Sequence, residues 1–242
     1  MRLALVHARL QIVELLRFPG FSVATLGFPS LLFLLFGLPR AGHDANLLLG
    51  SYAAFAVLGV GFFQFGVSVA IERGTPWQLF VRTLPATAAS RLAGRVLAAL
   101  AFAASSSAIV VAVALGTTSA SLDTTQWLRL AAALLLGSIP FVLLGLAIAF
   151  WASAKSALPV ANILYMLLAY AGGLWTGPQD LPHAIRALSP YTPTRQWGDV
   201  LWPAVAGGAW RASHWLALAA YGAVFTLVAA WGYRRDEGQR FR

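Results

Sequence analysis

Residues 72–85 read Glu-Arg-Gly-Thr-Pro-Trp-Gln-Leu-Phe-Val-Arg-Thr-Leu-Pro, and this polar stretch separates two long uncharged runs. The run before it is Ala45–Ile71; the run after it, Val96–Leu122, begins once the stretch has ended at Arg95. Each run has 27 residues without an acidic or basic side chain. About 20 apolar residues are enough to cross the hydrocarbon core of a bilayer, so each run predicts a membrane-spanning helix. The stretch Glu72–Arg95 is therefore expected at a membrane surface.

The stretch itself predicts a compact amphipathic helix. Thr75 is a suitable N-cap, Pro76 suits the first helical position, and Gln78 has the capping-box spacing. Pro85 disfavours helical geometry at the residue before it and ends the element. The apolar face of this helix, at positions i, i+3, i+4 and i+7, consists of Trp77, Phe80, Val81 and Leu84. A short helix of this kind between two spans must dock on lipid headgroups, on its own bundle or on a partner protein.

The composition is that of an integral membrane protein. The chain has 242 residues, of which 59% are hydrophobic and 10% are charged, and its mean hydropathy is +0.73. A soluble domain carries about 25% charged residues. The formal charge of +9 does not indicate nucleic acid as a partner, because the basic residues are scattered over short connectors. The absence of cysteine excludes disulfides, thiolate zinc sites and cysteine nucleophiles.

Charged residues divide the chain into six long uncharged runs, each longer than a bilayer requires. The runs are Phe18–Pro39, Ala45–Ile71, Val96–Leu122, Leu130–Ala154, Ser156–Gln179 and Ala212–Tyr233. We therefore expect an all-α integral membrane fold with six transmembrane helices and both termini on one side. Pro29 and Pro140 are expected to kink the first and fourth spans.

The distribution of basic residues predicts the orientation. Twelve basic residues would lie on the side of the termini, namely Arg2, Arg9, Arg17, Arg73, Arg82, Arg91, Arg95, Lys155, Arg234, Arg235, Arg240 and Arg242. Five would lie on the other side, namely Arg40, Arg129, Arg186, Arg195 and Arg211. Since cytoplasmic loops carry the excess of Lys and Arg, both termini and the Glu72–Arg95 stretch are predicted to be cytoplasmic.

Two further segments have helical patterns outside the spans. Residues 1–17 predict a moderately amphipathic helix lying on the membrane surface, the alternative being a plain basic leader. The connector Asp180–Arg211 is the longest and is predicted to be external. Its Pro-rich pieces and its apolar end, Val200–Trp210, which is too short to span, favour two short helices that enter the outer leaflet or cap the bundle. The alternative is an irregular external loop.

The order and spacing of several short motifs resemble the ABC-2 type permeases, which are the membrane subunits of bacterial ABC exporters. The resemblance covers nearly the whole chain. It rests on Glu14-Leu15-Leu16-Arg17 with Phe28-Pro29, on Gln64-Phe65-Gly66, on Glu72-Arg73, on Leu79–Pro85, on Pro140 with Gly145, on Gly172-Gly173-Leu174-Trp175 with Leu181-Pro182, and on Leu188-Ser189-Pro190 with Pro193-Thr194. Gly74-Thr75-Pro76 departs from the family pattern, in which Ser-Gly often follows the Glu-Arg pair. The resemblance implies one permease domain over residues 1–242, an N-terminal interfacial helix, six spans, a cytoplasmic coupling helix after span 2, and external re-entrant helices between spans 5 and 6.

ATP hydrolysis is not expected on this chain. A P-loop requires G-x-x-x-x-G-K-[ST], and the sole lysine, Lys155, follows Ser153-Ala154 in a short connector. A separate nucleotide-binding subunit would then bind ATP and Mg²⁺, with no cofactor on this chain. The proposed coupling residues are Glu72, Arg73, Trp77, Phe80, Arg82 and Leu84, of which Trp77, Phe80 and Leu84 would enter a groove on the ATPase. The alternative is that Trp77 and Phe80 anchor a membrane-surface helix.

Polar residues inside spans suggest a transport path, because such residues are costly in lipid and often functional. The candidates are Phe62, Gln64, Phe65, Asn162 and Tyr165. If Gln64 and Asn162 face the centre, neighbouring aromatics would line a site for a bulky amphipathic substrate. The alternative is interhelical hydrogen bonding, with aromatics facing lipid. Gly59, Gly61 and Gly66 are predicted to allow close helix packing.

The sequence contains no catalytic set, and no metal site is expected. It has no H-E-x-x-H, no paired carboxylates and no G-x-S-x-G. We therefore expect the permease subunit of an ABC exporter in the bacterial inner membrane, working as a homodimer or heterodimer and moving a drug, lipid or metabolite outward. The alternatives are an ATP-independent secondary transporter or channel, and a membrane scaffold that transports nothing.

Overall fold

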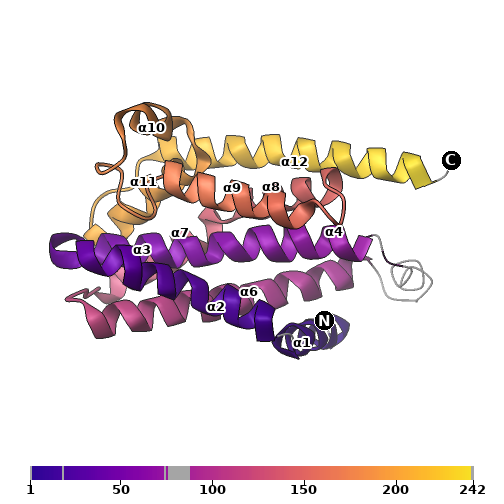
Figure 1. Cartoon of the computed structure of the whole chain (residues 1–242), viewed down its shortest axis with the longest axis horizontal. Helices are drawn as coiled ribbons and strands as arrows, with labels where there is room; N and C mark the ends of the chain where they lie inside the picture. The colour runs from indigo at the N-terminus through magenta and orange to yellow at the C-terminus, as the bar shows by residue number, and fades with distance from the viewer. Residues whose placement is uncertain (1, 18, 74, 76–87, 241–242) are drawn as a thin grey trace.

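The computed structural model describes residues 2–17, 19–73, 75 and 88–240. All regular elements in these residues are helices, which confirms the all-α prediction. Most of them run roughly parallel along the long axis of the molecule (Figure 1). One end of this bundle carries α10 and α11, and the other carries the end of α4 and the C-terminal end of α12 (Figure 1).

The described helices fall into two groups, one before residue 74 and one after residue 87. The elements up to Arg73 are α1 (Arg2–Arg17), α2 (Pro19–Leu32), η1 (Phe33–Gly37), η2 (Leu38–Arg40), α3 (Ala41–Val60), η3 (Gly61–Val67) and α4 (Ser68–Arg73). The elements after residue 87 are α6 (Ala88–Thr117), α7 (Thr124–Gly137), α8 (Ile139–Trp151), α9 (Ala157–Ala171), α10 (His183–Leu188), η4 (Ser189–Tyr191), α11 (Pro193–Ala206) and α12 (Ala212–Arg240).

Four helical segments in the described residues, some of them with a local irregularity, are long and apolar enough to cross a membrane. They are Asp44–Arg73, Ala93–Thr117, Thr124–Trp151 and Ala212–Arg235. They coincide with four of the six uncharged runs. The other two runs coincide with shorter apolar helices, Thr25–Arg40 and Ala157–Ala171. The six-span count therefore stays a prediction.

Glycine lets the second and fourth of the uncharged runs approach at backbone distance. A Cβ on Gly145 of α8 would lie 2.4 Å from the carbonyl oxygen of Gly61, and one on Gly66 would lie 3.3 Å from the carbonyl oxygen of Gly145. The π-helix η3 contains both Gly61 and Gly66. The predicted close packing at Gly61 and Gly66 is thus confirmed, since the backbones of η3 and α8 leave no room for a side chain at Gly145.

Proline acts differently in the two helices where a kink is expected. Pro140 follows a break, because α7 ends at Gly137 and α8 begins at Ile139. Pro29 lies inside α2, which continues three residues further and then widens into the π-helix η1. A π-turn is a common local response to a disturbed hydrogen-bond ladder inside a helix.

The helix α11 closes one end of the bundle. The indole of Trp197 is fully buried, and its Nε1–H donates to the carbonyl of Ala133 in α7 at 2.9 Å. Val200, Leu201 and Ala204 on the same helix are also buried. This buried face packs α11 against the rest of the bundle, and the external cap or re-entrant arrangement stays a prediction. The five basic residues assigned to the external side all belong to, or directly precede, elements at this end (Figure 1).

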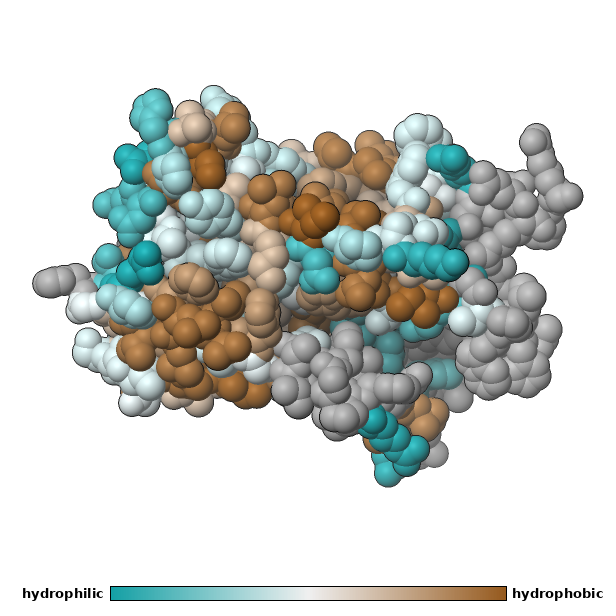
Figure 2. Space-filling view, in the orientation of Figure 1, coloured by the Kyte–Doolittle hydropathy of each residue, from teal (hydrophilic) through white to brown (hydrophobic). Residues whose placement is uncertain are grey.

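The outer face of the bundle is largely apolar. Leu128, Leu135, Ile163, Leu216 and Leu227 are all more than half exposed. Apolar side chains cover much of the length of the visible face, and hydrophilic ones gather at the end that carries α10 (Figure 2). An exposed surface of this composition is typical of a protein whose solvent is lipid.

Candidate coupling and transport sites

An ion pair joins the end of α4 to α6. The guanidinium of Arg95 donates through Nη2 to Oε2 of Glu72. The Arg95 side chain is 17% exposed and that of Glu72 is 37% exposed, so the pair is partly shielded from water. Of the coupling residues predicted from sequence, only Glu72 and Arg73 can be located, because Trp77, Phe80, Arg82 and Leu84 lie outside the described residues.

Arg95 also reaches the interior of the bundle. Its Nη1 donates to the backbone carbonyl of Gln64, in the π-helix η3, at 3.3 Å. A single side chain therefore joins the surface carboxylate of Glu72 to the backbone of a buried segment. Sequence reasoning did not select Arg95, although it marks the end of the polar stretch; nothing in the sequence identifies its partner in η3.

Arg73 connects the same surface to α8. Its Nη2 donates to the carbonyl of Ala152 at 3.0 Å, and its guanidinium lies 5.9 Å from the ring centroid of Phe150. Ala152 is the C-cap of α8, where the last carbonyls of a helix have no partner inside the helix. A cation at this position also interacts favourably with the helix dipole. Glu72 and Arg73 thus attach the end of α4 to two other helices.

Thr75, predicted as the N-cap of the following helix, donates its hydroxyl to the carbonyl of Glu72 at 2.7 Å. Its backbone N–H donates to the same carbonyl at 3.0 Å. The chain therefore turns tightly as α4 ends. The helix expected after Thr75 falls outside the described residues.

Gln64 is the most unusual polar residue inside the bundle. Its side chain is 1% exposed, and neither its amide nitrogen nor its amide oxygen has a hydrogen-bond partner among the described residues. Leaving a buried amide unpaired costs about 1–3 kcal/mol. Phe62 and Phe65, both predicted with it, are also buried in η3. An unpaired amide in an apolar interior is a candidate for contact with a ligand or for a change of partner during a conformational transition.

Tyr165 of α9 packs in an aromatic cluster against the same segment. Its ring is stacked on Phe55 with centroids 4.4 Å apart, and its hydroxyl donates to the Phe55 carbonyl at 3.2 Å. Phe63 and Phe62 lie 5.6 and 6.2 Å from it, centroid to centroid. Phe62 and Tyr165, two of the predicted path residues, are therefore neighbours. Phe55 and Phe63 were not predicted, because their helix positions alone do not distinguish interior from lipid.

Asn162 lies on a different surface from Gln64. It is exposed on α9, whereas Gln64 is enclosed in η3. Leu158, Ile163 and Leu167 are exposed on the same helix, at 49%, 66% and 57%. Within one chain the two amides therefore do not face a common centre. An amide on an apolar surface is expected to meet a second polar group from another protein surface.

The described residues hold no group of three or more His, Asp or Glu side chains that could bind a metal ion. At the end of α4, the structure instead brings together two guanidinium groups, those of Arg73 and Arg95, which bind backbone carbonyls and the carboxylate of Glu72. Such an arrangement can transmit movement between helices, since each guanidinium joins two or more elements.

Comparisons with known proteins agree with this picture. A family model described as ABC-2 family transporter protein matches residues 42–231. The Bacillus subtilis (strain 168) protein named "Putative transport permease YvfS" is 26% identical over 194 residues, which are 80% of this chain and 79% of that protein. No solved structure matches the chain. Together with the long apolar helices, the family match indicates a multi-pass membrane protein.

Proposed function

Because the chain belongs to the ABC-2 family of transporter proteins, we propose that it is the permease subunit of an ATP-driven exporter in a bacterial inner membrane. The family implies an ATPase partner. The sequence has no P-loop, so ATP and Mg²⁺ would bind on that separate subunit. The observation that carries the proposal furthest is the bonding of Arg95, which links the surface carboxylate of Glu72 to the buried segment η3.

The proposed topology has six spans with both termini in the cytoplasm. Span 1 would combine α2, η1 and η2, and span 5 would be α9, in addition to the four long helical segments. The excess of basic residues at the end of the bundle that carries the C-terminus supports this orientation. The helix α1, which packs against α6 and exposes Leu5, Val6 and Leu10, would lie at the cytoplasmic membrane surface.

In the proposed mechanism, closure of the ATPase subunits pushes the segment between α4 and α6. Trp77, Phe80, Arg82 and Leu84 would contact the ATPase, and Glu72, Arg73 and Arg95 would carry the displacement into α4, α8 and η3. The ATP-bound partner would favour one arrangement of the helices over another, which is a shift of population powered by differential binding. This route is supported by the hydrogen bonds that the Arg73 and Arg95 guanidinium groups donate to backbone carbonyls of other helices.

A second copy of the permease, or a related subunit, would complete the path. Asn162 and its apolar neighbours on α9 offer a surface for helix–helix contact, in which the amide forms an interhelical hydrogen bond. The unpaired Gln64 and the aromatic residues Phe62, Phe65 and Tyr165 would then line or border the path for a hydrophobic or amphipathic substrate. Movement of η3 would expose Gln64 to that path.

The test is reconstitution with a candidate nucleotide-binding ATPase subunit from the same organism. The full chain and the ATPase are purified together in lipid nanodiscs, and ATP hydrolysis is measured with and without the permease. We expect the permease to alter the hydrolysis rate several-fold and Glu72→Arg to abolish this effect while membrane insertion is kept. Asp180→Arg is the matched control, since it reverses an exposed carboxylate in the connection between α9 and α10.

Two results would contradict the proposal. One is an ATPase that neither co-purifies with the wild-type chain nor changes its rate in its presence. The other is export from inverted vesicles that continues without ATP, which would favour a secondary transporter. Addition of candidate drugs, lipids and metabolites to the same assay then identifies the cargo by the compounds that stimulate hydrolysis.

A further inference from the structure

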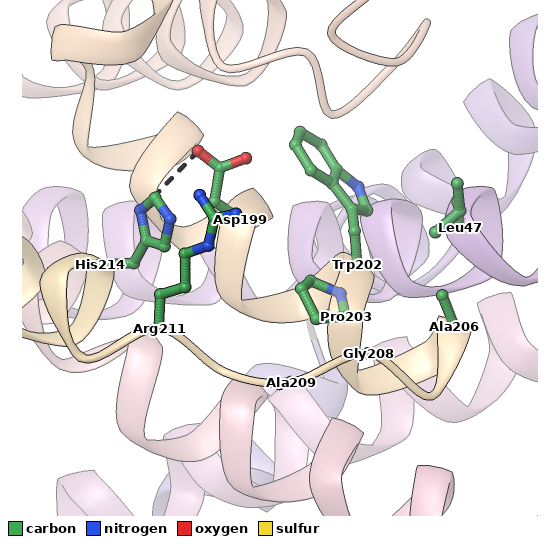
Figure 3. A pocket seen from close by; sticks show the side chains of 9 residues that line it. All are labelled: Leu47, Asp199, Trp202, Pro203, Ala206, Gly208, Ala209, Arg211 and His214. Atoms are coloured by element: carbon green, nitrogen blue, oxygen red, sulfur yellow. Dashed lines mark ion pairs between the residues drawn. The ribbon is translucent and has the colours of Figure 1, made fainter.

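A pocket lies at the end of the bundle that carries α10, away from the coupling residues. It has a volume of about 430 Å³ and lies between α3, α11, the connection from α11 to α12, and the start of α12 (Figure 3). Its lining residues are Leu47, Asp199, Trp202, Pro203, Ala206, Gly208, Ala209, Arg211 and His214. The helix α11 supplies one face at positions i, i+3, i+4 and i+7, and Gly207, with φ +76°, turns the chain back across it.

One side of the pocket is polar and is formed by Asp199, Arg211 and His214. Asp199 accepts a hydrogen bond from Nε of Arg195 at 2.9 Å, and Oδ2 of Asp199 lies 3.9 Å from Nδ1 of His214. The same nitrogen of His214 lies 2.8 Å from the side-chain oxygen of Gln196. Arg211 is exposed at the rim, and no carboxylate among the described residues lies within ion-pair distance of it. The guanidinium of Arg195 is thus paired with Asp199, whereas that of Arg211 has no carboxylate partner among the described residues.

The other side of the pocket is an apolar wall held in place. Trp202 donates through Nε1 to the hydroxyl of Ser51 at 2.8 Å, and its ring lies under the guanidinium of Arg195 at 5.2 Å. Leu47, Pro203 and Ala206 complete the wall. Charged and apolar groups therefore face the same space from opposite sides (Figure 3). A rigid wall of this kind costs little to organise on binding.

Aromatic residues beside the pocket are of the type found at the boundary between lipid and water. Trp210 lies just before Arg211, and its ring is 4.7 Å from the guanidinium of Arg129 and 5.5 Å from the ring of Trp215. Tryptophan is enriched at the headgroup level of membranes. Basic pockets at this level are suited to phosphate-bearing lipid headgroups.

We propose that this pocket binds the headgroup of an anionic phospholipid. The Arg211 guanidinium would donate to the phosphate, His214 and Asp199 would bond headgroup hydroxyls, and the wall of Trp202, Pro203 and Leu47 would pack against the glycerol and first chain carbons. The inference requires that the chain spans a membrane with this end at the surface. It does not require that the chain transports anything or binds an ATPase.

The test is lipid binding to the full purified chain without ATPase. The protein is stripped of lipid in detergent, and retention of phosphatidylglycerol or phosphatidylcholine is followed by native mass spectrometry over a lipid titration. We expect one phosphatidylglycerol to bind about tenfold more tightly than phosphatidylcholine, and Arg211→Gln to remove this preference, as expected for loss of a charged hydrogen bond. Arg40→Gln, which removes an exposed guanidinium at the same end but outside the pocket, should leave it intact.

A second variant separates the shape of the pocket from its charge. Ala206 is exposed and lines the pocket, so Ala206→Trp would fill the space without entering the core. This variant should lose phosphatidylglycerol while its thermal unfolding in detergent is unchanged. The proposal would be overturned if Arg40→Gln lost phosphatidylglycerol binding as strongly as Arg211→Gln. It would also be overturned if both pocket variants kept the wild-type preference for phosphatidylglycerol. Displacement of the lipid by millimolar inorganic phosphate would also overturn it, because the site would then recognise a free anion.

Discussion

Glu72 at the end of α4 and Arg95 in α6 form an ion pair, and the same guanidinium donates to the Gln64 carbonyl in the π-helix η3. The two residues stand at the two sides of the connection that the family resemblance assigns to ATPase coupling. In the proposed mechanism, a displacement of this connection would act on η3, where the side-chain amide of Gln64 is buried and has no partner among the described residues. The following experiments test this relationship and the packing around it.

Reversing the charge of either residue alone should weaken coupling more than exchanging the two residues in a double variant. We expect Glu72→Arg and Arg95→Glu each to reduce permease-dependent ATP hydrolysis at least fivefold, because each leaves two like charges adjacent. The double exchange should recover part of the loss, but not all of it, since a glutamate at 95 cannot donate to the Gln64 carbonyl. If the loss of ATP hydrolysis in the double variant equals the sum of the losses in the two single variants, expressed as free energies, the ion pair itself is unimportant.

Replacement of Gln64 by leucine should raise stability while it lowers transport. The change removes two unpaired buried polar atoms at similar volume, so the free energy of unfolding is expected to rise by about 1–3 kcal/mol. Thermal unfolding in detergent and transport in proteoliposomes are measured on the same preparation. A less stable Gln64→Leu protein would mean that the amide has a partner in the assembled protein.

A side chain at position 145 should separate α8 from η3. Its Cβ would meet the Gly61 carbonyl oxygen at 2.4 Å, so Gly145→Ala is expected to cost about 1–3 kcal/mol of unfolding free energy. Gly116→Ala is the control, because a Cβ there meets nothing within 4 Å and alanine favours the helix. Equal melting temperatures for both variants would contradict the close approach of the two backbones.

The exposed amide of Asn162 should matter for assembly and not for the fold of one chain. An interhelical hydrogen bond in a membrane contributes about 0.6–2 kcal/mol, so Asn162→Leu is expected to weaken self-association roughly three- to thirtyfold. Association is measured by energy transfer between labelled chains over a range of lipid-to-protein ratios. Ile163→Leu, at the neighbouring exposed position, should associate like the wild type. Unchanged association of Asn162→Leu would remove α9 from the proposed interface.

The sequence was most informative where physical chemistry acts locally. Uncharged runs longer than a bilayer requires predicted where helices form, and four of the six coincide with helical segments long enough to span. Pro140 predicted the discontinuity that occurs between α7 and α8. The glycines at 61 and 66 predicted close packing, because the absence of a side chain is itself a packing property.

Partners between distant segments could not be read from the sequence. Gln64 and Asn162 are both amides in apolar runs, yet one is enclosed and the other faces outward, since rotation of each helix about its axis is fixed by contacts with its neighbours. For the same reason Arg95 was noticed only as a charge at the end of a stretch. The pocket around Arg211 could not be predicted either, because its lining residues come from α3, α11, the connection after α11 and the start of α12, which meet only in the folded chain.

What the sequence by itself determined is therefore the class of protein, the positions of its helices and the sorting of its charges between two ends. These follow from hydrophobicity, helix length and the cost of placing charge in lipid, each of which acts residue by residue. Only the tertiary structure decided that Arg95 bonds to η3, that Tyr165 stacks on Phe55, and that an arginine, a carboxylate and a tryptophan share one pocket. Such pairings depend on how whole helices pack, which no single stretch of sequence contains.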